Sequence, residues 1–390
     1  MDSQQILDSN FHINSFEARL SGMTNIYLNG KRVGDNISVG ITFNNTNFKK
    51  TFEAKEDFFL EDSILSIYKG KGLKIGDSYT LMTFNPLTLA KEEVVVAVIG
   101  KEGNNLILET RLAGLVSKNW INEDGYVIRE ETSNGWLMKL ENKKEIDKHL
   151  AETGVNNAVD LITNVSVPVS KRIEHPRQLN FMKIKVSGIE LKDFPFAEER
   201  QKLVDQKKGI IEIKTITPEK DEAIPLPYQD QKLNEYLQPS LWIQSDDAKI
   251  QAKAREIIKG EKNSWLAAKR INDWLYKNIN KSFSIGIPVA TSILAEKKGD
   301  CNEHTVLFVS LARAVGLPAE TCVGLVYMNN GFYYHAWPKV YVGKWMHLDP
   351  TFGQSVADAT HIELVSGDIS SQTKLVQVIG KIKIEVLEKI

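Results

Sequence analysis

The chain has 390 residues, 42% of them hydrophobic, and its 49 basic and 50 acidic side chains nearly cancel. The length predicts a globular protein of two or three domains, and the balanced charge gives no support to a nucleic-acid partner or an anionic membrane. We expect no transmembrane segment, because no run of about 18 apolar residues occurs, and the N-terminal residues Met1–Gln5 show no signal peptide.

Residues 1–150 are expected to form a β-rich N-terminal domain. Short alternating or apolar runs lie between turn residues from about 16 to 128, as in Tyr79-Thr80-Leu81-Met82. This pattern is typical of strands joined by hairpins. The polar segment Glu141–Glu152 predicts a short helix.

Residues 151–240 are expected to form a second extended region that ends in a linker. Phe181–Val186 and Gly209–Lys214 have the composition of strands. Four prolines then interrupt the polar residues 216–240. We interpret that stretch as the connection to a C-terminal domain.

Residues 241–390 are expected to form a C-terminal domain in which helices come first and strands follow. The apolar period predicts helices over Ala248–Ile258, Trp265–Ile279, Ala290–Glu296 and Cys301–Val315. Strands are predicted over Glu320–Met328, Phe332–Val342, Lys344–Leu348 and Gly380–Val386. The predicted class is therefore α+β, with helices packed on an antiparallel sheet.

The segment Gly299-Asp300-Cys301 indicates a nucleophile at the start of a helix. Asp300 stands where the N-cap is expected, so Cys301 lies in the first turn, near free backbone N–H groups and the positive end of the helix dipole. That environment favours the thiolate, and the amide of Cys301 is a candidate oxyanion donor. Cys322 is the other cysteine of the chain. An active Cys301 requires both to be reduced, although two cysteines leave a bridge open.

A thiolate nucleophile also needs a base that protonates the leaving group and an acid that orients the base. His335 and Asp349 lie on two predicted strands joined by a tight turn. A turn centred on Val342 sets the two residues opposite each other, and their equal parity directs both side chains to one face. The predicted triad is Cys301, His335 and Asp349.

Three motifs closely resemble bacterial proteins of the transglutaminase-like superfamily: Gly299–His304, Tyr334–Trp337 and Trp345–Thr351. The resemblance covers about 248–360 and implies a papain-like fold in which the same three residues form the triad. It also implies export to the periplasm or cell envelope, although without a signal peptide the cytoplasm stays open. The superfamily includes transglutaminases, cysteine peptidases and peptide amidases, so the resemblance indicates mechanism more than substrate.

Seven further residues are candidates for the surroundings of the triad: Asp300, Glu303, His304, Trp337, His347, Asp358 and His361. His304 follows Cys301 by three residues on the same helix, but no evident acid orients it, so we favour a structural role. Trp337 is expected either to wall the site or to pack in the core. His347 precedes Asp349 by two residues and is a candidate to share its face, whereas Asp358 and His361 are expected either near the site or in a closing loop.

The leading hypothesis is a thiol acyl-transfer enzyme that acts on an amide or peptide bond of a peptide or protein substrate. Hydrolysis is the simpler outcome, because amine transfer requires a site that excludes water. The alternatives are transglutaminase-type amine transfer and a catalytically silent module that binds peptide or glycan.

A third interpretation treats four residues as metal ligands: Cys301, His304, His335 and His347. No CxxC or HExxH pattern supports it. We therefore expect neither a metal nor a cofactor, and the sequence leaves the oligomeric state open.

Overall fold

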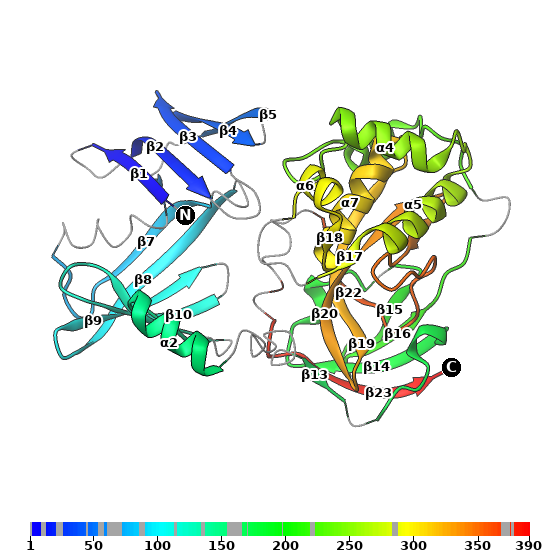
Figure 1. The fold of residues 1–390 in the computed structure, drawn as a ribbon. Coiled ribbons are helices and arrows are strands. Elements are labelled where there is room, and N and C mark those ends of the chain that lie inside the picture. Colours follow the sequence, from blue (N-terminus) through cyan, green and yellow to red (C-terminus); the bar gives the residue numbers. More distant parts are fainter. Residues whose placement is uncertain are drawn as a thin grey trace. The chain divides into compact units, whose positions relative to one another are not determined.

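The computed structural model describes residues 2–8, 13–20, 26–43, 46–53, 58–60, 72–85, 90–112, 115–133, 137–153, 166–169, 171–196, 198–218, 223–282, 288–367, 375 and 378–390. The chain divides into two units, Met1–Asp160 and Leu161–Ile390, and each is described by itself (Figure 1). None of the helices in these ranges combines the length and the apolar character that crossing a membrane requires.

The first unit contains two sheets built mostly from sequential antiparallel strands. One is a five-stranded meander of β1 (Asp2–Leu7), β2 (Ile13–Leu20), β3 (Ile26–Val33), β4 (Asn36–Phe43) and β5 (Thr46–Glu53). The other has the strand order β12 (Leu137–Lys139), β11 (Val127–Thr132), β10 (Leu115–Ile121), β9 (Asn105–Leu112), β8 (Ala90–Glu102), β7 (Ser78–Asn85) and β6 (Phe58–Leu60). Helix α2 (Lys143–Thr153) follows. The β-rich character predicted for this part is confirmed.

The described residues of the second unit form four α-helices and two antiparallel sheets. The helices are α4 (Ala248–Ile258), α5 (Ser264–Asn278), α6 (Ala290–Glu296) and α7 (Cys301–Ala314). One sheet contains β13 (Val167–Pro168), β20 (Gly331–Tyr341), β19 (Ala319–Met328) and β22 (Ile362–Ser366), with β21 (Trp345–His347) on β20. The other contains β15 (Gln201–Asp205), β16 (Ile210–Lys214), β14 (Phe181–Ser187) and β23 (Lys383–Lys389). The α+β class is confirmed.

Shorter elements also occur in the part of this unit that the structure describes. A two-stranded parallel ladder joins β17 (Asn280–Lys281) to β18 (Lys298–Gly299), just before α7. Three 3-10 helices are η3 (Pro176–Gln178), η4 (Leu191–Asp193) and η5 (Gln231–Leu237).

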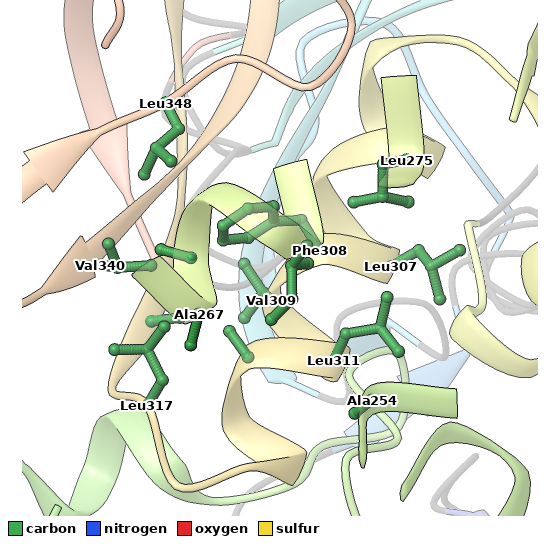
Figure 2. Close-up of a cluster of buried hydrophobic side chains, with 14 of the residues drawn as sticks. Ala254, Ala267, Leu275, Leu307, Phe308, Val309, Leu311, Leu317, Val340 and Leu348 are labelled. Carbon is green, nitrogen blue, oxygen red and sulfur yellow. The ribbon is translucent and has the colours of Figure 1, made fainter. Parts of the chain in front are cut away.

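Helix α7 is the central helix of the second unit. Its residues 303–312 are all buried, which is the pattern of a helix enclosed on every side. It packs against α4, α5 and α6 and against β20 (Figure 1). Figure 2 shows its side chains Leu307, Phe308 and Leu311 among Leu275 of α5 and Val340 of β20. The helix end that carries Cys301 is thereby fixed over the sheet.

The sheet of β19, β20 and β22 is covered on its other face by the sheet of β14, β16 and β23. Met182, Ile184 and Val186 alternate toward this second core, as the period of two requires. Residues 167–214, for which the sequence suggested a separate region, therefore fold with the second unit. Ile216 and Leu226 of the proline-containing stretch are buried in the helical core instead of forming an exposed linker.

The hairpin of β20 and β21 has a different register from the expected one. The strands pair about Gly343, not Val342, so the direct cross-strand pairing of His335 with Asp349 is wrong. Strand β21 ends at His347, and Asp349 lies beyond it. A shift of the turn centre by one residue moves every cross-strand partner by two residues, so the side chains stay on the same faces. Both side chains therefore still reach the same face.

Gly324 of β19 predicts a steric limit on the pairing with β22. A Cβ atom at this position would lie 1.9 Å from the backbone oxygen of Ile362. We expect Gly324→Ala to lower the free energy of unfolding by about 1–3 kcal/mol, because β22 must move away. The control Gly100→Ala, in β8, would place its Cβ no closer than 3.9 Å to a neighbour. Urea unfolding followed by tryptophan fluorescence measures both, and equal losses would contradict this packing.

Candidate active site

Cys301 is the first residue of α7 and is half-buried against the core between the two sheets. Asp300 is the N-cap, as predicted, and its side chain accepts a hydrogen bond of 2.8 Å from the amide of Asn302. Glu303 completes a capping box by accepting a bond of 2.9 Å from the amide of Asp300. Cys301 and Cys322 are both free cysteines. These hydrogen bonds therefore fix the first turn of α7, which carries the thiol.

His335 and Asp349 form a buried pair. Nε2 of His335 donates to Oδ2 of Asp349 at 2.8 Å. The other carboxylate oxygen, Oδ1, accepts bonds of 2.8 and 3.0 Å from the amides of Thr351 and Phe352. Asp349 is fully buried, so these bonds fix both its rotamer and the orientation of the imidazole.

The electrostatics of the pair depend on all three predicted triad residues. Burial by itself lowers the pKa of His335, but the charges of Asp349 and Cys301 and the hydrogen bond to Asp349 raise it to about 9. Burial acts to raise the pKa of Asp349, and the charge and hydrogen bond of His335 hold it well below its usual range. The thiol of Cys301 therefore lies near enough to the imidazole for its charge to act on His335. The geometry therefore brings the three residues together.

Aromatic rings hold the imidazole of His335 in place. The ring of Phe352 stacks on it with a centroid distance of 4.9 Å and an interplanar angle of 20°, and Trp337 does so at 6.0 Å and 19°. Trp337 is fully buried, and its Nε1 donates to Nδ1 of His347 at 3.0 Å. Phe352 was missed in the sequence analysis, although it directly follows the Asp349-Pro350-Thr351 motif.

Asp358 and His361 lie beside Asp349. Nε2 of His361 reaches Oδ2 of Asp349 at 2.9 Å. Asp358 forms an ion pair of 2.8 Å with Arg177, and the guanidinium of Arg177 lies 4.4 Å from the ring centroid of Phe352. Arg177 was also missed, because it comes from a region far from the motifs to which the sequence assigns no chemistry.

His304 has a local contact in the capping turn. Its Nδ1 bonds the backbone oxygen of Asp300 at 2.7 Å, and the side chain is fully buried. Burial lowers its pKa, so it is neutral at pH 7. These contacts support the structural role predicted for His304.

Two groups of buried side chains within the described ranges have the composition of a metal site: Cys322, His347 and Glu363, and His335, Asp349 and His361. An indole N–H can only donate, so the bond from Trp337 makes Nδ1 of His347 an acceptor and leaves the proton of the neutral ring on Nε2. That nitrogen, which faces Glu363 at 3.6 Å, is not free to bind a metal. The second group is spaced at hydrogen-bond distances of 2.8 and 2.9 Å, shorter than the ~3.3 Å that tetrahedral zinc sets between ligands.

The metal set considered from the sequence is not brought together as one group. His347 lies with Cys322 and Glu363 instead, behind Trp337. Lys339, buried in the same place, pairs with Glu363 at 2.9 Å and with Glu198 at 3.2 Å. This polar cluster was missed, because nothing in a strand sequence distinguishes a buried lysine from an exposed one.

Residues 251–350 match the family model of the transglutaminase-like superfamily. Similar solved structures include a candidate cysteine protease from Cytophaga hutchinsonii, with 16% identity and a TM-score of 0.36, over 54% of this chain and 87% of that one. The periplasmic domain of TgpA from Pseudomonas aeruginosa, bound to ethylmercury, has 13% identity and a TM-score of 0.31, over 48% and 89%. A candidate protease from Parabacteroides distasonis has 12% identity and a TM-score of 0.22, over 70% and 66%. A comparison with curated proteins finds no match.

The capping box predicts a pH dependence of stability. Burial, with a hydrogen bond to Asp300 and its charge, raises the pKa of Glu303 from 4.5 to about 7. Folding therefore favours the protonated carboxyl, and this stabilisation is present at low pH and is lost as the pH rises from about 4.5 to about 7. Glutamine at position 303 keeps a donor toward Asp300 at every pH. We therefore expect the free energy of unfolding of Glu303→Gln, measured relative to wild type, to be higher at pH 8 than at pH 5.

Urea unfolding at pH 5 and pH 8 measures this difference. Glu256→Gln on the exposed side of α4 is the control and should differ from wild type equally at both pH values. A difference for Glu303→Gln that does not change with pH would contradict the raised pKa.

Proposed function

The chain belongs to the transglutaminase-like superfamily through residues 251–350, as its motifs predicted, and we propose that it is a thiol acyl-transfer enzyme. The reaction is cleavage of an amide or peptide bond, with Cys301 as nucleophile, His335 as acid and base, and Asp349 as the residue that orients His335. The observation that carries this proposal is the buried imidazole of His335, which is hydrogen-bonded to Asp349 at 2.8 Å and lies close enough to Cys301 for the charge of the thiolate to raise its pKa.

In the acylation step the thiolate of Cys301 attacks the carbonyl carbon of the amide. The carbonyl π electrons move onto oxygen, and the amide of Cys301 is the proposed donor to this oxyanion, because the next amide, of Asn302, already donates to Asp300. When the tetrahedral intermediate collapses, the C–N bond breaks and the His335 imidazolium gives its proton to the departing amine. The products are a free amine, a thioester on Cys301 and a neutral His335.

In the deacylation step neutral His335 takes a proton from water, which attacks the thioester carbonyl. The C–S bond breaks, the acid is released, and the thiolate–imidazolium pair is restored. Cys301 is only half-buried, so water can reach the thioester, and this supports hydrolysis over amine transfer. If an amine replaces water in the same step, the product is the transamidated substrate.

We propose a peptide or protein as the substrate, since the relatives that the motifs resemble act on amide bonds of that class. The same resemblance supports a location in the periplasm or cell envelope. The codons upstream of Met1 test the location, because they either do or do not encode a signal peptide.

Product masses test the reaction. We expect the full chain, incubated with a library of peptides and amines, to release products of hydrolysis. Cys301→Ala should lower the rate of product formation by at least about 10³-fold. Cys322→Ala is the matched control, since Cys322 is fully buried in β19 and outside the triad, and it should retain activity. Activity that survives Cys301→Ala contradicts the proposal, whereas binding of a library member without any product favours the silent binding module.

The raised pKa of His335 predicts the alkaline limb of the reaction. The leaving group needs the imidazolium, so kcat/KM should fall as the pH rises through about 9. In Asp349→Asn the carboxylate charge that raises the pKa is lost, so the residual activity should decline at a lower pH. A pH–rate profile for hydrolysis of the peptide measures the alkaline limb in both proteins. If the limb of Asp349→Asn lies at the same pH as that of wild type, another group titrates there.

A further inference from the structure

A second histidine shares the carboxylate that orients His335. Nε2 of His361, immediately before β22, lies 2.9 Å from Oδ2 of Asp349, the same oxygen that accepts the bond of His335 at 2.8 Å. His361 and Asp349 are both fully buried. A carboxylate oxygen can only accept, so Nε2 of His361 carries a proton.

The other ring nitrogen of His361 also faces acceptors only. Nδ1 lies 3.3 Å from the backbone oxygen of Asp358 and 3.5 Å from Oδ1 of its side chain. A neutral ring would turn a bare lone pair toward these oxygens. The form with a proton on both nitrogens satisfies every neighbour, whereas either neutral tautomer leaves one nitrogen opposed to an acceptor.

We propose that His361 is a positioning residue, held as a buried imidazolium between Asp349 and Asp358, that locks the carboxylate of Asp349 and offsets part of its charge. This inference rests on the proposed function, because it concerns how the triad is tuned. It assigns to the site a second cation in addition to the His335 imidazolium.

Three other cationic groups lie near His361 and oppose a positive charge on its ring. Arg200 donates to the backbone oxygens of Asp358 and His361 and opposes a positive charge there. Arg177, paired with Asp358 at 2.8 Å, opposes it from further away. His335 has its ring centroid 5.9 Å away.

The two carboxylates in direct contact outweigh these cations. Burial lowers the pKa of His361, but the charge of Asp358 and the hydrogen bonds to both carboxylates raise it overall. His347, the other buried histidine nearby, has its pKa lowered by burial and by adjacent cations, so it adds no charge.

The shared carboxylate has a consequence for proton transfer. Without a second cation on the same carboxylate oxygen, the charge of Asp349 would act on His335 alone and would bind its proton more tightly. A more basic His335 is a poorer acid toward the departing amine. His361 therefore keeps the pKa of His335 in a range in which the proton can be passed on.

The protonation of His361 can be measured without any substrate. We expect ¹⁵N-histidine NMR of the full chain, with His361 assigned by the spectrum of His361→Gln, to show both ring nitrogens protonated between pH 6 and pH 8. An unprotonated ring nitrogen in that range would overturn the proposal. Since the protonation is read from the wild-type chain without substrate, this result does not depend on whether the enzyme hypothesis holds.

The effect on His335 is tested by the same method. Gln at position 361 keeps a donor toward Asp349 and removes the charge, so the pKa of His335 should rise by about one unit. The matched control is His347→Gln, which removes a buried neutral ring of the same sheet and should leave that pKa unchanged. A pKa of His335 that stays the same or falls in His361→Gln would overturn the proposal. Failure of the proposed function would appear separately, as hydrolytic activity that persists in Cys301→Ala.

Discussion

The carboxylate of Asp349 is the group on which the arrangement of the site depends. It has no exposed surface, and an isolated charge in such a place costs several kcal/mol. Four hydrogen bonds satisfy it, from the rings of His335 and His361 and from the amides of Thr351 and Phe352. These donors come from β20, from the turn after β21 and from the start of β22. Removing any one of them leaves part of a buried charge unpaired.

The nucleophile comes from the other layer of the same unit. Helix α7 is enclosed by α4, α5, α6 and β20 (Figure 1), so its N-terminus cannot drift from the sheet that carries His335. The capping box fixes the first turn in the same way, at the cost of a carboxyl in Glu303 whose pKa is raised to about 7. Packing therefore sets the distance between thiol and imidazole, and hydrogen bonds set their orientation.

Much of this could be predicted where local chemistry decides. The N-cap at Asp300 and the bounds of α4 and α6 follow from side-chain periodicity and capping. The predicted turn centre was wrong by one residue. Counting between His335 and Asp349 gave Val342, whereas the turn is centred on Gly343, which takes the positive φ of 105°. Arg177 was missed because its approach to Asp358 joins residues 181 positions apart, which no local pattern records. His361 was named as a candidate, but its sharing of one oxygen with His335 depends on how β22 meets β19.

The rate at which iodoacetamide alkylates Cys301 at pH 7, compared between wild type and Asp349→Asn, tests the central claim most directly. If Asp349 stabilises the His335 imidazolium, and the imidazolium the thiolate, wild type should react faster than a free thiol peptide. The variant should then react roughly tenfold more slowly than wild type. Equal rates in the two proteins, or a wild-type rate no higher than that of the peptide, would contradict the account.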